Sequence, residues 1–500
     1  MHIRKALLIL FIVAGGSGFS QINRYWSQNF NDGSSMLAGA VVGGDAGAAA
    51  IFYNPANISE ITESRFSLSL SLFSIDSHKL NNALGDGINL KGTRFTAQPR
   101  FISYLIKMEK RKNMSMEIAF MNVANSNIRL SHAEDKVIDI LKDLPGEERY
   151  FGSYNQENIF RDDYFGAGLS YRLSENLVMG SSMFISVKSL KTHRDLEIEA
   201  GPLSDTVYIG ANPIPAYSAS YENLNEVRFQ NFSMIWKLGF NYKINSVSLG
   251  INFTIPSIDL FTSGKFMRYK QQRSNISNPD GSGFMTNYII IDQQENDDFK
   301  VRYKTPFSVA VGATFHSPND PDKSFFITAE YFSKLSQYTI VDAKDYSYAI
   351  PSFASNLSPD LFDYSYAARD IVNVAIAYRW VISEDLLLLS GFKTDFNFLQ
   401  GVELENNRLD NFHMNIYHLS AGVRFKLKQS VVLFGLQYSY SSTKGQNQIV
   451  NLKDPVEYNE YEKMPLVGNR SQTMDVGYNG VSFFIGATLN FTRERKKSKD

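Results

Sequence analysis

Apolar and polar residues alternate along the C-terminal part of this chain, and this pattern limits its fold more than any other feature. In residues 481–491 every second side chain is apolar, and those between them are small or polar except Phe484. Successive side chains of a β-strand point to opposite faces, so the segment predicts a strand with one apolar face. At about 3.3 Å per residue and a tilt of about 45°, its length matches the apolar band of about 25 Å of a membrane-spanning barrel.

The same alternation recurs along the chain and predicts about fourteen strands. They are expected at residues 65–75, 95–107, 113–125, 161–173, 176–190, 226–243, 246–258, 301–316, 323–337, 368–381, 385–398, 411–428, 430–443 and 479–491. The connections between them are alternately long and short, and the long ones cover about 76–94, 126–160, 191–225, 259–300, 338–367, 399–410 and 444–478. Outer-membrane barrels have long outer loops and short periplasmic turns, so this order indicates an even strand number with both termini in the periplasm.

We therefore expect an all-β fold, a transmembrane antiparallel β-barrel of about 14 strands over residues 65–491. The alternative is a soluble β-sandwich, but its outward faces would be polar and its long loops would not gather at one end. The lumen of so wide a barrel is too large for the wall side chains alone to fill. Such a barrel needs a plug if water is not to flow through it.

Both ends of the chain have features of an exported protein. Three basic or titratable residues, His2, Arg4 and Lys5, precede an apolar run and then a stretch of small residues that ends at Ser20. This order is typical of a secretory signal peptide, so we expect cleavage after residue 20. Residues 492–500 are mostly charged and are expected to form a solvated periplasmic tail.

Composition and motifs exclude several function classes. The chain has no cysteine, hence no disulfide or thiolate metal site, and its net charge of -1 gives no reason to expect a nucleic-acid partner. The sequence motifs of hydrolase elbows, zinc-binding helices and phosphate loops are absent. His413 and His418 are five residues apart on a predicted strand, so they point to opposite faces. We expect no enzymatic activity, no metal site and no cofactor.

Residues 21–64 are rich in glycine and alanine and lack the strand alternation. Small side chains allow backbone segments to pack closely in a confined space. Near the end of this segment Asn54 is expected to be the N-cap of a helical turn, with Pro55 at its first position. We interpret residues 21–64 as a luminal hatch that plugs the barrel.

The hatch segment resembles the FadL/TodX family of outer-membrane long-chain fatty-acid transporters. The resemblance rests on a small-residue run that contains Asp45 and is followed by Phe52, Tyr53, Asn54, Pro55 and Ala56 before the first strand. The strand number, the length and a Thr-Pro pair before residues 307–315 agree with it. It implies that Asn54, Pro55 and Ala56, with Asp45 as a weaker match, belong to a plug inside the lumen.

In that family a kinked third strand opens the wall laterally. The third predicted strand here, residues 114–125, has no glycine to mark a bend, which is a departure from that expectation. Its asparagines, Asn122 and Asn125, and Asn127 just after it tolerate irregular backbone better than most residues. The loop after this strand contains an apolar stripe at helical spacing and predicts an amphipathic helix. The stripe consists of Val137, Ile138, Ile140, Leu141 and Leu144.

A carboxylate ligand requires a cation that faces the lumen. The alternation points four basic residues inward, and two of them, Lys237 and Arg424, are expected to lie deep enough to bind such a head group. The other two, Arg379 and Lys426, are expected near the periplasmic ends of their strands. The apolar residues Phe484 and Ile235 are also assigned to the lumen, as parts of an apolar pocket or as packing for the plug.

The resemblance implies passive uptake of long-chain fatty acids or similar hydrophobic molecules, in contact with outer-membrane lipid. Two other functions are also compatible with the sequence. One is a FadL-like barrel partner of a protein secretion system, which would bind a secreted protein, and the other is a porin for polar solutes. The sequence names neither the ligand nor the oligomeric state.

Overall fold

The computed structural model of the protein describes residues 24–26, 30, 32–61, 64–108, 113–141, 146–203, 206–209, 211–215, 218–277, 284–291, 301–341, 364–400, 412–428, 430–462 and 464–490. The predicted signal peptide (1–20) and charged tail (492–500) lie outside the described residues. No helix in the described part of the chain is long and apolar enough to cross a membrane.

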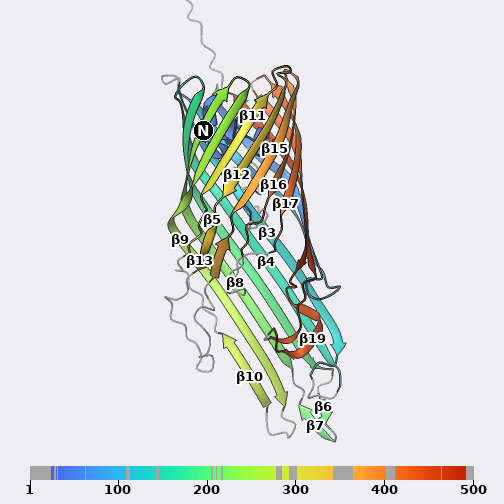
Figure 1. Ribbon diagram of the computed structural model, residues 1–500. Coiled ribbons are helices and arrows are strands. Elements are labelled where there is room, and N and C mark those ends of the chain that lie inside the picture. Colours follow the sequence, from blue (N-terminus) through green and yellow to red (C-terminus); the bar gives the residue numbers. More distant parts are fainter. Residues whose placement is uncertain are drawn as a thin grey trace, which may run out of the picture.

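Fourteen antiparallel strands close into a barrel, as the alternation predicted (Figure 1). In chain order they are β1 (Arg65–Asn81), β2 (Leu90–Lys107), β3 (Met114–Ile138), β4 (Glu148–Arg172), β5 (Leu177–Pro202), β8 (Ala219–Ile244), β9 (Val247–Ser277), β11 (Ser308–His316), β12 (Lys323–Phe332), β15 (Ile371–Ser383), β16 (Leu386–Asp395), β17 (Ile416–Leu427), β18 (Ser430–Gln446) and β21 (Met474–Asn490). The ring closes where β1 pairs with β21, from Arg65 opposite Asn490 onward.

Seven shorter strands lie outside this ring of fourteen. They are β6 (Thr206–Ile209), β7 (Asn212–Pro215), β10 (Phe284–Ile291), β13 (Leu335–Val341), β14 (Tyr364–Ala368), β19 (Asn451–Asn459) and β20 (Met464–Gly468). Three pairs of them form two-stranded sheets, β6 with β7, β13 with β14 and β19 with β20, and β10 extends the main sheet by pairing with the far end of β9.

The outward face of the wall is apolar. Large side chains that are exposed there come from strands all around the barrel, and they include Phe165, Met183, Trp236, Leu249, Val311, Phe325, Ile376, Leu419, Phe434 and Leu489. A soluble protein buries most such residues, whereas a membrane barrel presents them to lipid. The structure therefore agrees with the predicted lipid-facing wall.

The strands are much less equal in length than the sequence predicted. Strands β3, β4, β5, β8 and β9 have 25 to 31 residues and continue beyond the barrel as a curved sheet, visible in the lower half of Figure 1. Much of what was predicted as long loops, residues 126–160, 191–225 and 259–300, is therefore strand. The alternation does continue there, since every second residue of β4 is buried from Glu148 onward.

The inner side of this extension is covered by the ends of β1, β2 and β21, by residues 412–416 and by the β19–β20 hairpin. Together they form an apolar core that includes Leu80, Leu90, Leu130, Tyr150, Ile198, Tyr221, Met414, Leu452 and Val476. The apolar stripe does not form a helix, because Val137 and Ile138 end strand β3. Ile140 and Leu141 belong to this core and Ile138 packs against it, whereas Val137 is exposed. The predicted helix is therefore wrong, and its last member, Leu144, lies outside the described residues.

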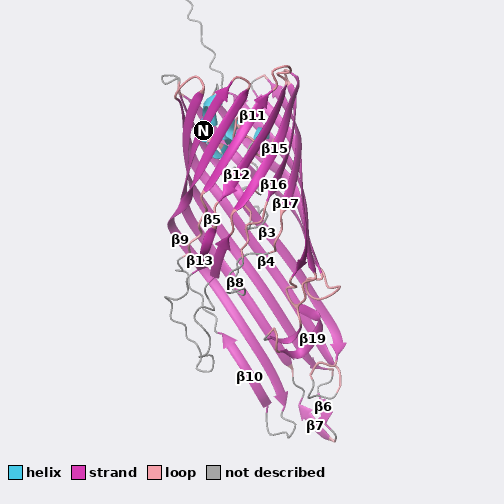
Figure 2. Cartoon of the chain, in the orientation of Figure 1, coloured by secondary structure: helices cyan, strands magenta, loops and turns pink. Residues whose placement is uncertain are grey.

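The hatch lies inside the barrel at the end that carries the short turns, where Figure 2 shows the helices. It consists of α2 (Asp32–Met36), η2 (Gly47–Ala49), α3 (Ala50–Tyr53) and η3 (Pro55–Glu60). Its side chains pack with wall residues in a second core that includes Met36, Val41, Ile51, Ile58, Phe101, Phe184, Ile235 and Phe484. The last two were assigned to the lumen from the alternation.

Glycines of the wall make room for the hatch. At eight described positions a Cβ atom would come within 3.0 Å of a hatch atom, and we call these residues the glycine belt. The belt consists of Gly168, Gly180, Gly239, Gly250, Gly312, Gly391, Gly422 and Gly435. A clash this close cannot be relieved by a rotamer change where the opposing atom is backbone, as it is for Gly250 against the Val42 carbonyl.

We expect Gly250→Ala to lower the free energy of unfolding by about 1–3 kcal/mol, the usual cost of overpacking. The matched control is Gly477→Ala in β21, where the atoms nearest to an added Cβ are 3.7 Å away or more. Denaturant titration of the refolded barrel in detergent measures both. Equal stability of the two variants would show that the hatch does not press against the wall.

Candidate ligand site

The hatch motif predicted from the sequence is buried and bonded as a capped turn. The Asn54 side chain accepts a hydrogen bond from the Ala56 amide at 3.1 Å, and Pro55 is at the first position of η3, as predicted. The Asn54 amide also donates to the Val42 carbonyl at 2.9 Å and to the Phe240 carbonyl of β8 at 3.0 Å. One side chain thus ties together two parts of the hatch and the wall.

Asp45 makes a second link between the hatch and the wall. Its carboxylate accepts a hydrogen bond from Arg379 of β15 at 2.7 Å, and its backbone amide donates to Glu60 at 3.1 Å. Arg379, predicted near the end of its strand, therefore holds the hatch.

Residues 24–26, at the start of the predicted hatch segment, run deep into the lumen and make contacts that the sequence did not predict. Arg24 Nε lies 3.1 Å from Asp395 Oδ2, and the Trp26 amide donates to the other oxygen of the same carboxylate at 3.0 Å. The Trp26 indole donates to Glu330 at 2.7 Å, and Lys393 donates to the Trp26 carbonyl. Burial lowers the pKa of the Arg24 guanidinium, and the Asp395 carboxylate opposes that shift.

Tyr25 fills an aromatic slot between the wall and the inner loops. Its ring stacks between Phe332 and Phe398, with centroid distances of 4.3 and 4.2 Å. Burial raises the pKa of its phenol well above the usual value. Residues 24–26 are thus held in the lumen by ion pairs and hydrogen bonds, and by stacking of the Tyr25 ring.

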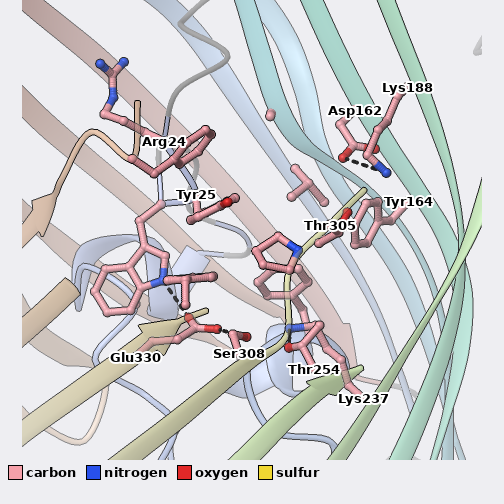
Figure 3. Close-up of a pocket in the computed structure, with 18 of the residues that line it drawn as sticks. Arg24, Tyr25, Asp162, Tyr164, Lys188, Lys237, Thr254, Thr305, Ser308 and Glu330 are labelled. Atoms are coloured by element: carbon pink, nitrogen blue, oxygen red, sulfur yellow. Dashed lines mark hydrogen bonds and ion pairs between the residues drawn. The ribbon is translucent and has the colours of Figure 1, made fainter. Parts of the chain in front are cut away.

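Beside this segment lies a cavity of about 100 Å³ (Figure 3). Aromatic residues form a large part of its wall, among them Tyr25, Trp26, Phe52, Phe160, Tyr164, Tyr303, Phe332, Tyr366 and Phe398. Charged side chains also line it, and Lys188 lies 3.8 Å from Asp162. The other charged residues are Arg24, Lys237, Lys304, Glu330 and Lys393. Aromatic walls suit a hydrophobic ligand, and the charged groups suit a polar head group.

Lys237, a residue predicted to bind a carboxylate, has its side chain in this cavity. It is 5% exposed, its ammonium donates to Thr254 Oγ1 at 3.1 Å, and it lies 4.1 Å from the centre of the Phe52 ring. In the described part of the chain no carboxylate lies within ion-pair distance of it. Burying a charge is costly unless it is paired, so this position favours an anionic ligand group.

Arg424, the other predicted binding residue, is on β17, four residues before the short turn that begins at Lys428. It is not among the residues that line the cavity. The structure therefore does not bring it together with Lys237, and ligand binding by Arg424 stays a prediction.

The cavity touches the wall where strand β3 is irregular. Val123 is an extra residue between Asn122 and Ala124 in the ladder with β4, and both Val123 and Ala124 line the cavity. The Asn122 amide bridges this bulge by donating to Ala124 O at 3.4 Å and to Asp163 at 2.8 Å. The strand thus bends without a glycine.

The ladder between β2 and β3 ends at the same level. It runs from Lys107 to Phe101 of β2 and stops opposite Met121, although both strands continue. We call the stretch beyond this point, between residues 90–100 and 122–130, the seam. The described β2–β3 ladder does not continue across the seam, and the cavity lies behind its inner end.

We expect Asp395→Asn to destabilise the protein by about 3–5 kcal/mol, because it leaves the buried Arg24 without its counter-charge. Asp135→Asn, which removes the partner of exposed Arg149, is the control and is expected to cost less than about 1 kcal/mol. Thermal unfolding in detergent compares the two. A loss at Asp395 no larger than at Asp135 would mean that residues 24–26 are not held in the lumen.

Comparison with known proteins gives structural relatives only. No family model and no curated protein matches the chain. A crystal structure of a Pseudomonas aeruginosa FadL homologue matches with a TM-score of 0.53 and 13% identity over 95% of this chain and 100% of the other. The toluene transporter TodX of P. putida matches with a TM-score of 0.51 and 12% identity, over 93% of this chain and 99% of the other.

A mutant of the TodX monoaromatic hydrocarbon channel gives a TM-score of 0.54 at 12% identity, with the same coverage. At such low identity these matches establish the architecture, and they agree with the barrel and the internal hatch described above. The chain therefore has the FadL fold, which its hatch motif and strand number predicted.

Proposed function

We propose that the protein is an outer-membrane channel for the passive uptake of long-chain fatty acids or similar hydrophobic molecules. The observation that carries this proposal is Lys237, a buried ammonium group in an aromatic cavity, without a carboxylate at ion-pair distance in the described chain. Aromatic rings suit an apolar chain, and the cation suits an acidic head group. Both chain ends would then be periplasmic, on the side of the short turns and the hatch.

The shape of the barrel supports a route through the wall. At one end of the lumen the hatch is packed against the glycine belt, and at the other end the core of the extension fills the space. The cavity lies between them and meets the wall at Val123 and Ala124 of the β3 bulge. A hydrophobic molecule would reach the cavity through the seam, without crossing a hydrated channel.

The cavity beside residues 24–26 is too small for a whole acyl chain. Tyr25 and Trp26 share the space with the ligand, so a long chain would enter as these side chains give way. The solved structures support an apolar cargo, since TodX, of the same fold, is described as a toluene transporter. Asp45, Asn54, Pro55 and Ala56 keep the hatch in place in this proposal.

We expect Lys237→Met to weaken the binding of a long-chain fatty acid by about ten-fold or more, the usual effect of losing a charge-assisted hydrogen bond. The methyl ester of the same acid has no charge to lose and should bind both proteins equally. Lys323→Met is the matched control, since Lys323 lies at a short turn and pairs with Asp320. Binding and uptake are measured with the purified barrel in liposomes.

Three outcomes of these measurements decide the function. Unchanged fatty-acid affinity in Lys237→Met would contradict the proposal. A loss in Arg424→Gln as well would bring that residue into the ligand path. Steady ion conductance of the wild-type barrel in planar bilayers would instead favour a porin.

A role as a secretion partner is supported by the extension, whose five strands form a large external platform. Many charges on its outer face pair with each other, as Arg129 does with Glu157 and Arg149 with Asp135. If this is the main role, affinity purification from membranes recovers one secreted protein in equal amount, and its recovery falls when residues 206–215 are deleted. The uptake proposal expects no such protein.

A further inference from the structure

The seam contains a polar pocket that the uptake proposal does not use. It has a volume of about 260 Å³ and is lined by Asp76 of β1, Arg94 of β2, and Asn127 and Arg129 of β3. Asp76 and Arg94 are cross-strand partners on the inner face of the β1–β2 sheet. Asn127 and Arg129 belong to the face of β3 whose later members, such as Ser131, are exposed. The pocket therefore lies where the inner face of one sheet meets the outer face of the next.

Asn127 is buried in this pocket without a partner. Asn127 is 3% exposed, and neither the oxygen nor the nitrogen of its side-chain amide has a hydrogen-bond partner in the described structure. Buried polar groups are nearly always hydrogen-bonded, and an unmade bond is costly. An amide in this situation indicates a ligand that completes its bonding.

Two guanidinium groups share the pocket with Asn127. Two carboxylates lie near them, since Asp76 also lines the pocket and Glu157 lies 2.5 Å from Arg129. Asp76 accepts a hydrogen bond from Tyr478 at 2.5 Å. An oxyanion in the pocket would provide further acceptors for the arginine N–H groups and a partner for the Asn127 amide.

We infer that the seam holds a binding site for an oxyanion, a carboxylate or a phosphate group, formed by Arg94, Arg129 and the Asn127 amide. The Arg129 side chain is 64% exposed, so the site is open to an incoming head group. Its position at the seam makes it the first polar contact for an anionic amphiphile that enters the wall. That last step rests on the proposed function, whereas the site itself does not.

The test measures binding in the Lys237→Met background, where the inner cavity does not contribute. The full-length barrel in detergent is titrated with carboxyl-labelled octanoate and, separately, with inorganic phosphate, followed by ¹³C and ³¹P NMR. We expect Arg94→Gln and Asn127→Ala each to raise the Kd about ten-fold or more. Arg149→Gln, on the outer face of the extension, is the matched control and should leave it unchanged.

The two ligands distinguish the sources of the oxyanion. Loss of affinity for octanoate alone assigns the site to amphiphile head groups, and loss for both assigns it to oxyanions in general. Asn127→Ala removes an unpartnered amide, so its melting temperature should be no lower than that of the parent, which separates loss of binding from misfolding. Octanoate and phosphate affinities that stay the same in both variants would overturn the inference.

This outcome is independent of the uptake proposal. If Lys237→Met leaves fatty-acid binding unchanged, that result contradicts only the role of the inner cavity and says nothing against the oxyanion site at the seam. Failure of the seam titration leaves fatty-acid binding by Lys237 untouched.

Discussion

The hatch fits against the wall because the wall has glycines, which carry no side chain, where the two meet. At Gly180, Gly250 and Gly391 the hatch backbone comes directly up to the strand. At Gly422 and Gly435 the Met36 side chain of the hatch occupies the space that a wall side chain would need. Asn54 adds directional bonds, since its amide reaches both the Val42 carbonyl of the hatch and the Phe240 carbonyl of the wall. A plug held in this way is part of the barrel core, and solutes must pass beside it.

The wall could be predicted from the sequence because lipid and lumen impose a period of two on every strand. The same rule placed Lys237 in the lumen, and local capping chemistry identified Asn54 and Pro55. The strand extensions were predicted as loops because no membrane faces them. Their outer side is polar, so the apolar alternation that marks the membrane strands is weaker there. The β3 bulge has no glycine to mark it, and the sign of it in the sequence was Asn122, which tolerates irregular backbone.

Long-range contacts set the other limit of sequence reasoning. The residues near Arg24 in the sequence do not predict its ion pair with Asp395. Those near Tyr25 do not predict that its ring stacks between Phe332 and Phe398. Alternation gives the face on which a side chain lies and not what lies opposite. For that reason Arg424 and Lys237 looked equivalent, although only Lys237 lines the cavity.

The order of the strands also has a consequence for assembly in the membrane. Each ladder of the wall joins strands that follow each other around the chain, except the ladder between β1 and β21, which joins its two ends. Such a contact forms late because the intervening chain must be organised first, and until then both strands have open edges. The hatch precedes β1 and contacts strands as late as β21, the last of the wall. It is therefore enclosed as the wall folds around it, and its insertion into a finished barrel is not required.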